Sequence, residues 1–193
     1  MTSRRRGVDL VAVIASMVVV NLVYGLTLPL LSLVLDAQGI SKTVIGLSIM
    51  AQACGGIAIA TFTARLITHF GAARLMQAAT VLAGVSLFSL ALLPNVYAWF
   101  PLRFLLGASA AILWSASEAV INEMAQDSWR GRIIGLYGAA GAAGFALGPL
   151  ILVFTGSEGI RPFAVTATLI LLAGLPLFWF EGRNHYADQG PPP

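Results

Sequence analysis

Charged side chains are scarce in this sequence. Asp, Glu, Lys and Arg make up 10% of its 193 residues, whereas 58% are hydrophobic and the mean hydropathy is +0.87. A soluble domain carries about 25% charged residues. A chain this apolar would expose too much hydrophobic surface to water, so the composition predicts a protein embedded in a lipid bilayer.

Cysteine and histidine are almost absent as well. Cys54 is the one cysteine, so no internal disulfide and no Cys-based metal site can form. The two histidines are His69, in a turn, and His185, near the end of the chain. No phosphate-binding loop is present, and the basic residues are scattered one to three at a time. We therefore expect no metal, no cofactor and no nucleic-acid partner.

Six apolar stretches account for most of the chain. A helix needs about 20 apolar residues to cross a bilayer, and the candidates are residues 10–35, 43–66, 75–93, 99–121, 133–155 and 162–180. The first is too long for the apolar region of a signal peptide, about 7–15 residues. No strand-like alternation competes, so we predict an all-α transmembrane bundle over residues 1–182, followed by a polar tail at 183–193.

The distribution of basic residues predicts the orientation, because cytoplasmic loops of membrane proteins carry an excess of Lys and Arg. A cytoplasmic amino terminus leaves only Lys42 and Arg161 outside. The inside group is then Arg4, Arg5, Arg6, Arg65, Arg74, Arg130, Arg132 and Arg183. Both termini are therefore expected in the cytoplasm.

Polar residues inside the apolar stretches are candidates for a polar path through the membrane. Asn21 and Tyr24 lie in the middle of the first stretch. Arg103, Trp114 and Glu118 fall on one helical stripe of the fourth. Charges inside a membrane segment usually face protein or a water-filled cavity. Two alternatives stay open: the polar face of the first helix serves helix packing or lines a cavity, and Arg103 reaches outward to the interface or turns inward.

A second candidate cluster lies where the fourth stretch ends. Glu123 is followed by Arg130 and Arg132, and Arg74 lies in the other turn expected on the same side of the membrane. We predict an ion network among these residues that helps to close the cytoplasmic side.

The fifth stretch contains glycines at helical spacing and then a proline. Gly135, Gly144 and Gly148 precede Pro149. Small residues three or four positions apart allow two helices to approach closely in lipid. This run predicts a close helix contact.

These motifs together resemble the amino-terminal half of a major facilitator superfamily transporter, over about residues 8–182. Arg103-Phe-Leu-Leu-Gly107 is similar to the family's helix-4 motif, and Gly135 to Pro149 to its helix-5 motif. In the turn after the second stretch, Thr68 stands where the family pattern has aspartate. The resemblance implies six helices arranged as 3+3 inverted repeats, with substrate bound between two six-helix halves near the middle of the membrane.

The function implied by the resemblance is secondary active transport of a small solute, coupled to protons, across the bacterial cytoplasmic membrane. Efflux and uptake both stay open, and a second six-helix unit is an expected partner. A membrane scaffold without transport activity is the alternative. An intramembrane serine protease built on Ser109 is disfavoured, because such a nucleophile needs a general base within hydrogen-bond reach and both histidines are expected far from it.

Overall fold

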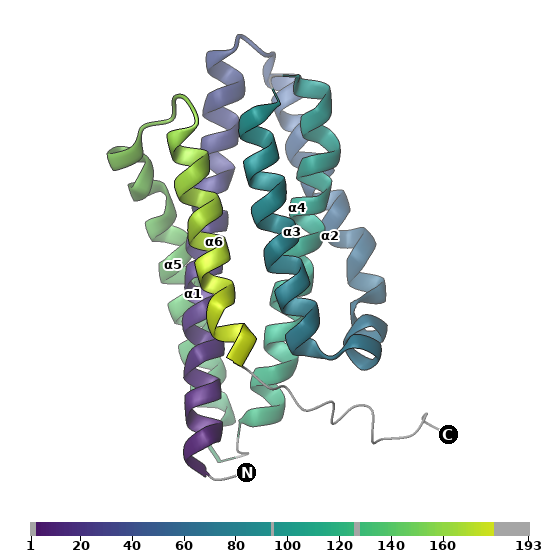
Figure 1. Ribbon diagram of the computed structural model, residues 1–193, viewed down its shortest axis with the longest axis vertical. Helices are drawn as coiled ribbons and strands as arrows, with labels where there is room; N and C mark the ends of the chain where they lie inside the picture. The colour runs from purple at the N-terminus through teal and green to yellow at the C-terminus, as the bar shows by residue number, and fades with distance from the viewer. Residues whose placement is uncertain (1–2, 94, 126–127, 180–193) are drawn as a thin grey trace.

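The computed structural model describes residues 3–93, 95–125 and 128–179 (Figure 1), and side chains within these residues from Leu10 to Leu177. The predicted tail at 183–193, including Arg183, lies outside these residues. Six helices form the described chain: α1 Ser3–Ala37, α2 Lys42–Phe70, α3 Ala72–Leu92, α4 Val96–Met124, α5 Arg130–Thr155 and α6 Arg161–Trp179. No strand occurs among the described residues. The predicted all-α fold is confirmed.

Local caps and turns set the ends of the helices. Ser41 and Asn95 precede α2 and α4, and their side-chain oxygens accept hydrogen bonds from backbone N–H groups of the first turn, the usual role of an N-cap. Gly71 alone separates α2 from α3, with φ of 83°, a conformation that favours glycine. Because caps set these starts, α2 and α4 begin at Lys42 and Val96, before the apolar stretches that predicted them at 43 and 99.

Helices α1 to α5 are each long and apolar enough to cross a bilayer. The apolar part of α6, Arg161–Leu177, is shorter. It lies at the lower end of the length that spanning helices show, about 17–25 residues. Length and composition therefore agree with a six-helix membrane bundle.

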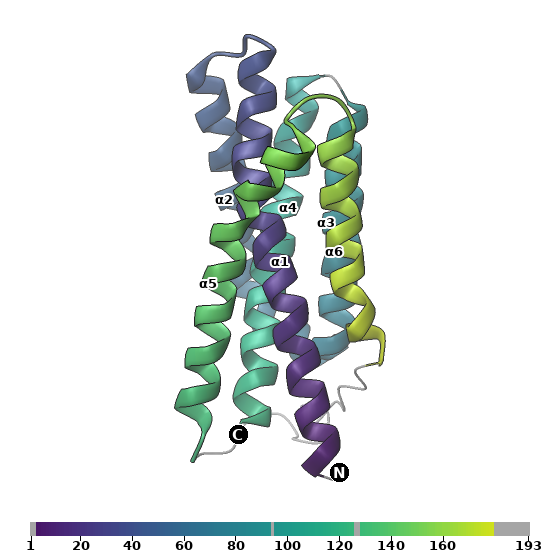
Figure 2. The same ribbon diagram turned by 90° about the vertical axis from the view of Figure 1, so that its left-hand side faces the viewer.

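The helices pack in a pattern that repeats. Helix α1 packs on α5 and α6, α4 packs on α2 and α3, and α3 packs on α6 (Figures 1 and 2). If α1 is exchanged with α4, α2 with α5 and α3 with α6, the same pairs of helices remain in contact. The arrangement is that of two three-helix repeats, as the resemblance implies.

Glycines form the closest contact between α1 and α5. A Cβ atom added to Gly25 would strike the carbonyl group of Phe145, and one added to Gly148 would lie 2.5 Å from the carbonyl oxygen of Leu22. Each helix therefore uses a glycine against the backbone of the other.

The crossing of α2 and α4 is built in the same way. A Cβ atom on Gly107 would strike the carbonyl group of Gln52, and one on Gly55 would strike that of Phe104. On each helix, the glycine comes three residues after the residue that the partner's glycine contacts, and the same spacing of three occurs in the α1–α5 crossing. Gly107 thus corresponds to Gly25, and Gly55 to Gly148, which places the two repeats in register.

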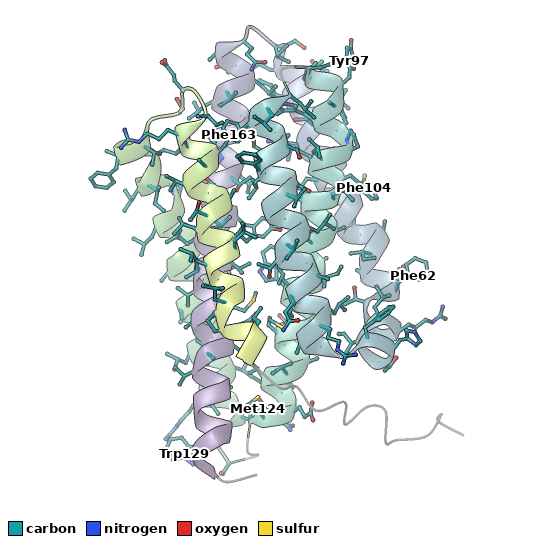
Figure 3. All side chains as sticks on the ribbon, in the orientation of Figure 1. Phe62, Tyr97, Phe104, Met124, Trp129 and Phe163 are labelled. Atoms are coloured by element: carbon teal, nitrogen blue, oxygen red, sulfur yellow. The ribbon has the colours of Figure 1, made fainter. Side chains whose placement is uncertain are left out.

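Helices α2 and α5 lie at the edges of the bundle. In each, 17% of the apolar segment is buried, against 61% in α4. Phe62 of α2 and Phe104 of α4 point away from the bundle (Figure 3) and are 53% and 39% exposed. In a bilayer, these outward apolar side chains would contact lipid.

Candidate functional site

A groove with a volume of about 480 Å³ lies between the two helix crossings. Its walls come from α1 and α5 on one side and from α2 and α4 on the other. The lining is apolar except for a few groups, and its larger side chains include Tyr24, Gln52, Trp114 and Phe145. No acidic or basic side chain of the described residues lines it.

Tyr24 and Trp114 bring an aromatic pair into the groove from opposite repeats. The Tyr24 hydroxyl donates a hydrogen bond to the carbonyl oxygen of Leu106 on α4, at 2.9 Å. The two ring centroids are 5.9 Å apart, within the range of aromatic pairs. Tyr24 is buried, whereas Trp114 is 38% exposed on the groove side. Two residues predicted for the transport path are therefore brought together.

Arg103 is enclosed between α4 and α2. It is 0% exposed, and its Nη1 donates a hydrogen bond to the Ser48 hydroxyl at 2.9 Å. Of the two alternatives that the sequence left open, the structure has the inward one. Arg103 nevertheless does not line the groove, although Gly107 and Trp114 of the same predicted stripe do.

The other two candidate path residues lie away from the groove lining. Asn21 donates a hydrogen bond to the carbonyl oxygen of Met17 in its own helix, at 2.8 Å. Its amide also faces Gly141 of α5, where an added Cβ would lie 3.3 Å from Asn21 Nδ2. Glu118 is exposed in the last turns of α4.

The predicted cytoplasmic ion network is not assembled in this structure. Glu123 and Arg74 are both exposed, and neither forms an ion pair with another described residue. Arg130 donates a hydrogen bond to a backbone carbonyl near the end of α4, at 3.3 Å. The Arg132 guanidinium lies 4.8 Å from the ring centroid of Trp129.

The glycine motif of α5 divides into two parts. Gly144 and Gly148 face α1, and a Cβ on Gly144 would lie 2.5 Å from the Val18 carbonyl oxygen. Gly135 has no neighbour within 4 Å of its Cβ position and takes no part in this contact. Pro149 lies within α5 and is exposed. The predicted close contact therefore involves the second half of the motif.

Sequence reasoning missed several residues of the site. Ser48 and Gln52 are one turn apart on α2, and this spacing is the only signal that could have indicated them. Ser117 and Tyr137 share a hydrogen bond of 2.9 Å that links α4 to α5. Neither residue stands out in the sequence, because the two are 20 residues apart and on different helices.

An all-helical bundle of two three-helix repeats, with a groove between its helix crossings, defines a polytopic membrane protein of the transporter type. The chain belongs to the Major Facilitator Superfamily, whose sequence profile matches residues 13–192. It is thus a member of a membrane transport family, and the resemblance seen in its motifs is confirmed.

Its similarity to individual curated proteins of Bacillus subtilis (strain 168) is distant. The chain is 26% identical to the uncharacterized MFS-type transporter YfkF over 167 residues, which cover 86% of the chain and 42% of YfkF. It is 24% identical to Multidrug resistance protein 1 over 172 residues, which cover 89% of the chain and 44% of that protein. The chain therefore spans less than half the length of the relatives it matches.

Proposed function

We propose that this chain forms one wall of a path for secondary active transport of a small solute. The observation that carries the proposal is the groove between the α1–α5 and α2–α4 crossings, with Tyr24 and Trp114 in its lining. An aromatic, mostly apolar lining suits a solute with an apolar body. The names of two relatives, Multidrug resistance proteins 1 and 2 of Bacillus subtilis, are in keeping with such a solute.

The opposing wall of the path comes, in this proposal, from a second six-helix unit. Family transporters bind substrate between two halves, and the chain covers 38–44% of the curated relatives it matches. Apolar side chains of the groove remain exposed in the single unit: Ile57 is 71% and Phe145 is 39% exposed. Such side chains would be covered by a partner or by the solute.

A proton gradient is the proposed energy source, with Arg103 and Glu118 as the candidate charged groups and Asn21 as a further polar group near the path. Both termini would face the cytoplasm of a bacterial cell, with the chain in its cytoplasmic membrane.

The cytoplasmic ion network would form in a conformation closed to that side, and its members would be Glu123, Arg130, Arg132 and Arg74. The α2–α3 turn and the start of α5, near which these arginines lie in the chain, are at the same end of the bundle (Figure 1), and this supports the network.

Reconstitution of the purified chain into proteoliposomes tests the proposal. Its oligomeric state is determined, and uptake of aromatic dyes of differing charge is followed with and without a proton gradient. Trp114→Ala and Tyr24→Ala should reduce transport, whereas Phe62→Ala, on the outward face of α2, should not. Gradient-driven transport by a strict monomer would refute the requirement for a second unit. Unchanged transport in both groove variants would refute the role of the groove as a transport path.

A further inference from the structure

Arg103 is a buried cation whose hydrogen-bonding capacity is only partly used. Its Nη1 bonds to Ser48, but Nε and Nη2 are buried without a partner. Leaving a buried donor unsatisfied is costly, and more so for a charged group. No counter-charge comes from the helices that pack on α4 most extensively, because neither α2 nor α3 contains an acidic residue. The guanidinium therefore lacks an anionic partner within the described bundle.

The fold itself does not require this charge. In the other repeat, Asn21 takes the place of Arg103 and Gly141 that of Ser48, four residues before Gly25 on α1 and seven before Gly148 on α5. That position is neutral, and the Asn21 amide bonds to its own helix. The same close crossing of two helices thus forms without a cation, so packing alone does not explain Arg103.

Gln52 connects the cation to the groove. It follows Ser48 by one turn on α2, and its backbone contacts Gly107, which follows Arg103 by one turn on α4. Gln52 and Gly107 both line the groove. The side-chain oxygen of Gln52 is also buried without a donor. The groove lining and the Ser48–Arg103 pair are therefore neighbours along both helices.

We infer that the groove takes molecules that combine a planar apolar body with an anionic group such as a carboxylate or a sulfonate. The body would lie against Tyr24 and Trp114, and the anionic oxygens would accept hydrogen bonds from Nε and Nη2 of Arg103. A guanidinium presents these two donors as a planar fork that matches such anions. This inference rests on the proposed function, because it names the substrate class of the same groove.

Two dyes that share the same aromatic body test this inference. 1-Anilinonaphthalene-8-sulfonate carries an anionic group, and N-phenyl-1-naphthylamine is the matching neutral molecule. Binding of each to the full chain in zwitterionic-lipid nanodiscs is measured by fluorescence titration, with empty nanodiscs subtracted. Arg103→Gln should weaken binding of the sulfonate about tenfold or more and leave the neutral dye nearly unchanged, since a hydrogen bond to a charged group is lost.

Three further variants keep the result unambiguous. Arg103→Lys keeps the charge without the fork and should lose part of the sulfonate affinity. Arg103→Asn copies the neutral counterpart Asn21 and replaces Arg103→Gln if that variant fails to insert. Arg161→Gln removes an exposed arginine at the start of α6, outside the groove, and should change neither dye.

The possible outcomes separate this inference from the function on which it rests. Unchanged sulfonate binding in Arg103→Gln, or an equal loss for both dyes, would overturn the anion site while leaving the groove as a binding site. If Trp114→Ala has no effect on the neutral dye, the groove is not a binding site, and the proposed function fails together with this inference.

Discussion

Replacement of glycine by alanine should change the free energy of unfolding in opposite directions, depending on whether the glycine lies at the crossing of α2 and α4. In Gly107→Ala, the new methyl group would strike the Gln52 carbonyl group, which belongs to the backbone and cannot move aside without moving the helix. The two helices must separate, and overpacking of this kind costs about 1–3 kcal/mol. Alanine favours a helix by up to about 1 kcal/mol over glycine, which offsets only part of this cost.

Gly135→Ala is the matched control. It makes the same substitution in a membrane helix, but, apart from its chain neighbours and its own helix backbone, no atom of the described residues lies within 4 Å of the added Cβ. Only the propensity gain of up to about 1 kcal/mol remains. Gly107→Ala should therefore lower the free energy of unfolding, while Gly135→Ala should leave it unchanged or raise it. Equilibrium unfolding in mixed micelles measures both.

A double substitution tests the geometry of the crossing itself. Gly55 and Gly107 belong to the same crossing, so a separation of α2 from α4 forced by one substitution also makes room for the other. The double variant should then lose less free energy of unfolding than the sum of the losses in Gly55→Ala and Gly107→Ala. Gly107→Ala and Gly148→Ala, at different crossings, should be close to additive. Equal effects of Gly107→Ala and Gly135→Ala would refute the close contact.

Two other predictions concern orientation and the link between repeats. In a Cys54→Ala background, an impermeant thiol reagent should label Lys42→Cys from outside and Arg132→Cys from the cytoplasm, and the reverse pattern would refute the orientation proposed from basic residues. Ser117→Ala and Tyr137→Phe each remove one side of the 2.9 Å hydrogen bond between α4 and α5. A double-mutant cycle should give a coupling of about 1 kcal/mol, and no coupling would mean that the bond contributes nothing.

The number and kind of elements could be predicted because bilayer thickness requires long apolar helices. Their ends could not be placed as well. The fourth stretch was predicted at 99–121, whereas α4 runs Val96–Met124, since its start depends on the Asn95 cap. A cap lies outside the apolar pattern and does not change the hydropathy.

The candidate site was only partly predictable, because spacing gives the face of a helix but not its neighbour. Helical spacing predicts that Arg103 and Trp114 share one face of α4. Trp114 lines the groove, however, whereas Arg103 donates a hydrogen bond to Ser48 of α2. Gly135 and Gly148 look alike in the sequence, and only Gly148 contacts another helix. Such differences arise from the packing of helices that are far apart in the chain.

In the proposed function, the groove forms part of a path that is open to water. In a Cys54→Ala background, Ala111→Cys places a thiol in the groove lining, and Val85→Cys places one on α3, where Val85 is 57% exposed on the surface of the bundle. The rate of reaction with a water-soluble maleimide is measured for both in lipid bilayers. Ala111→Cys should be labelled fast, and a bound aromatic dye should slow this labelling, whereas Val85→Cys, which would face lipid, should be labelled slowly. Equal, slow labelling of the two thiols would contradict this proposal.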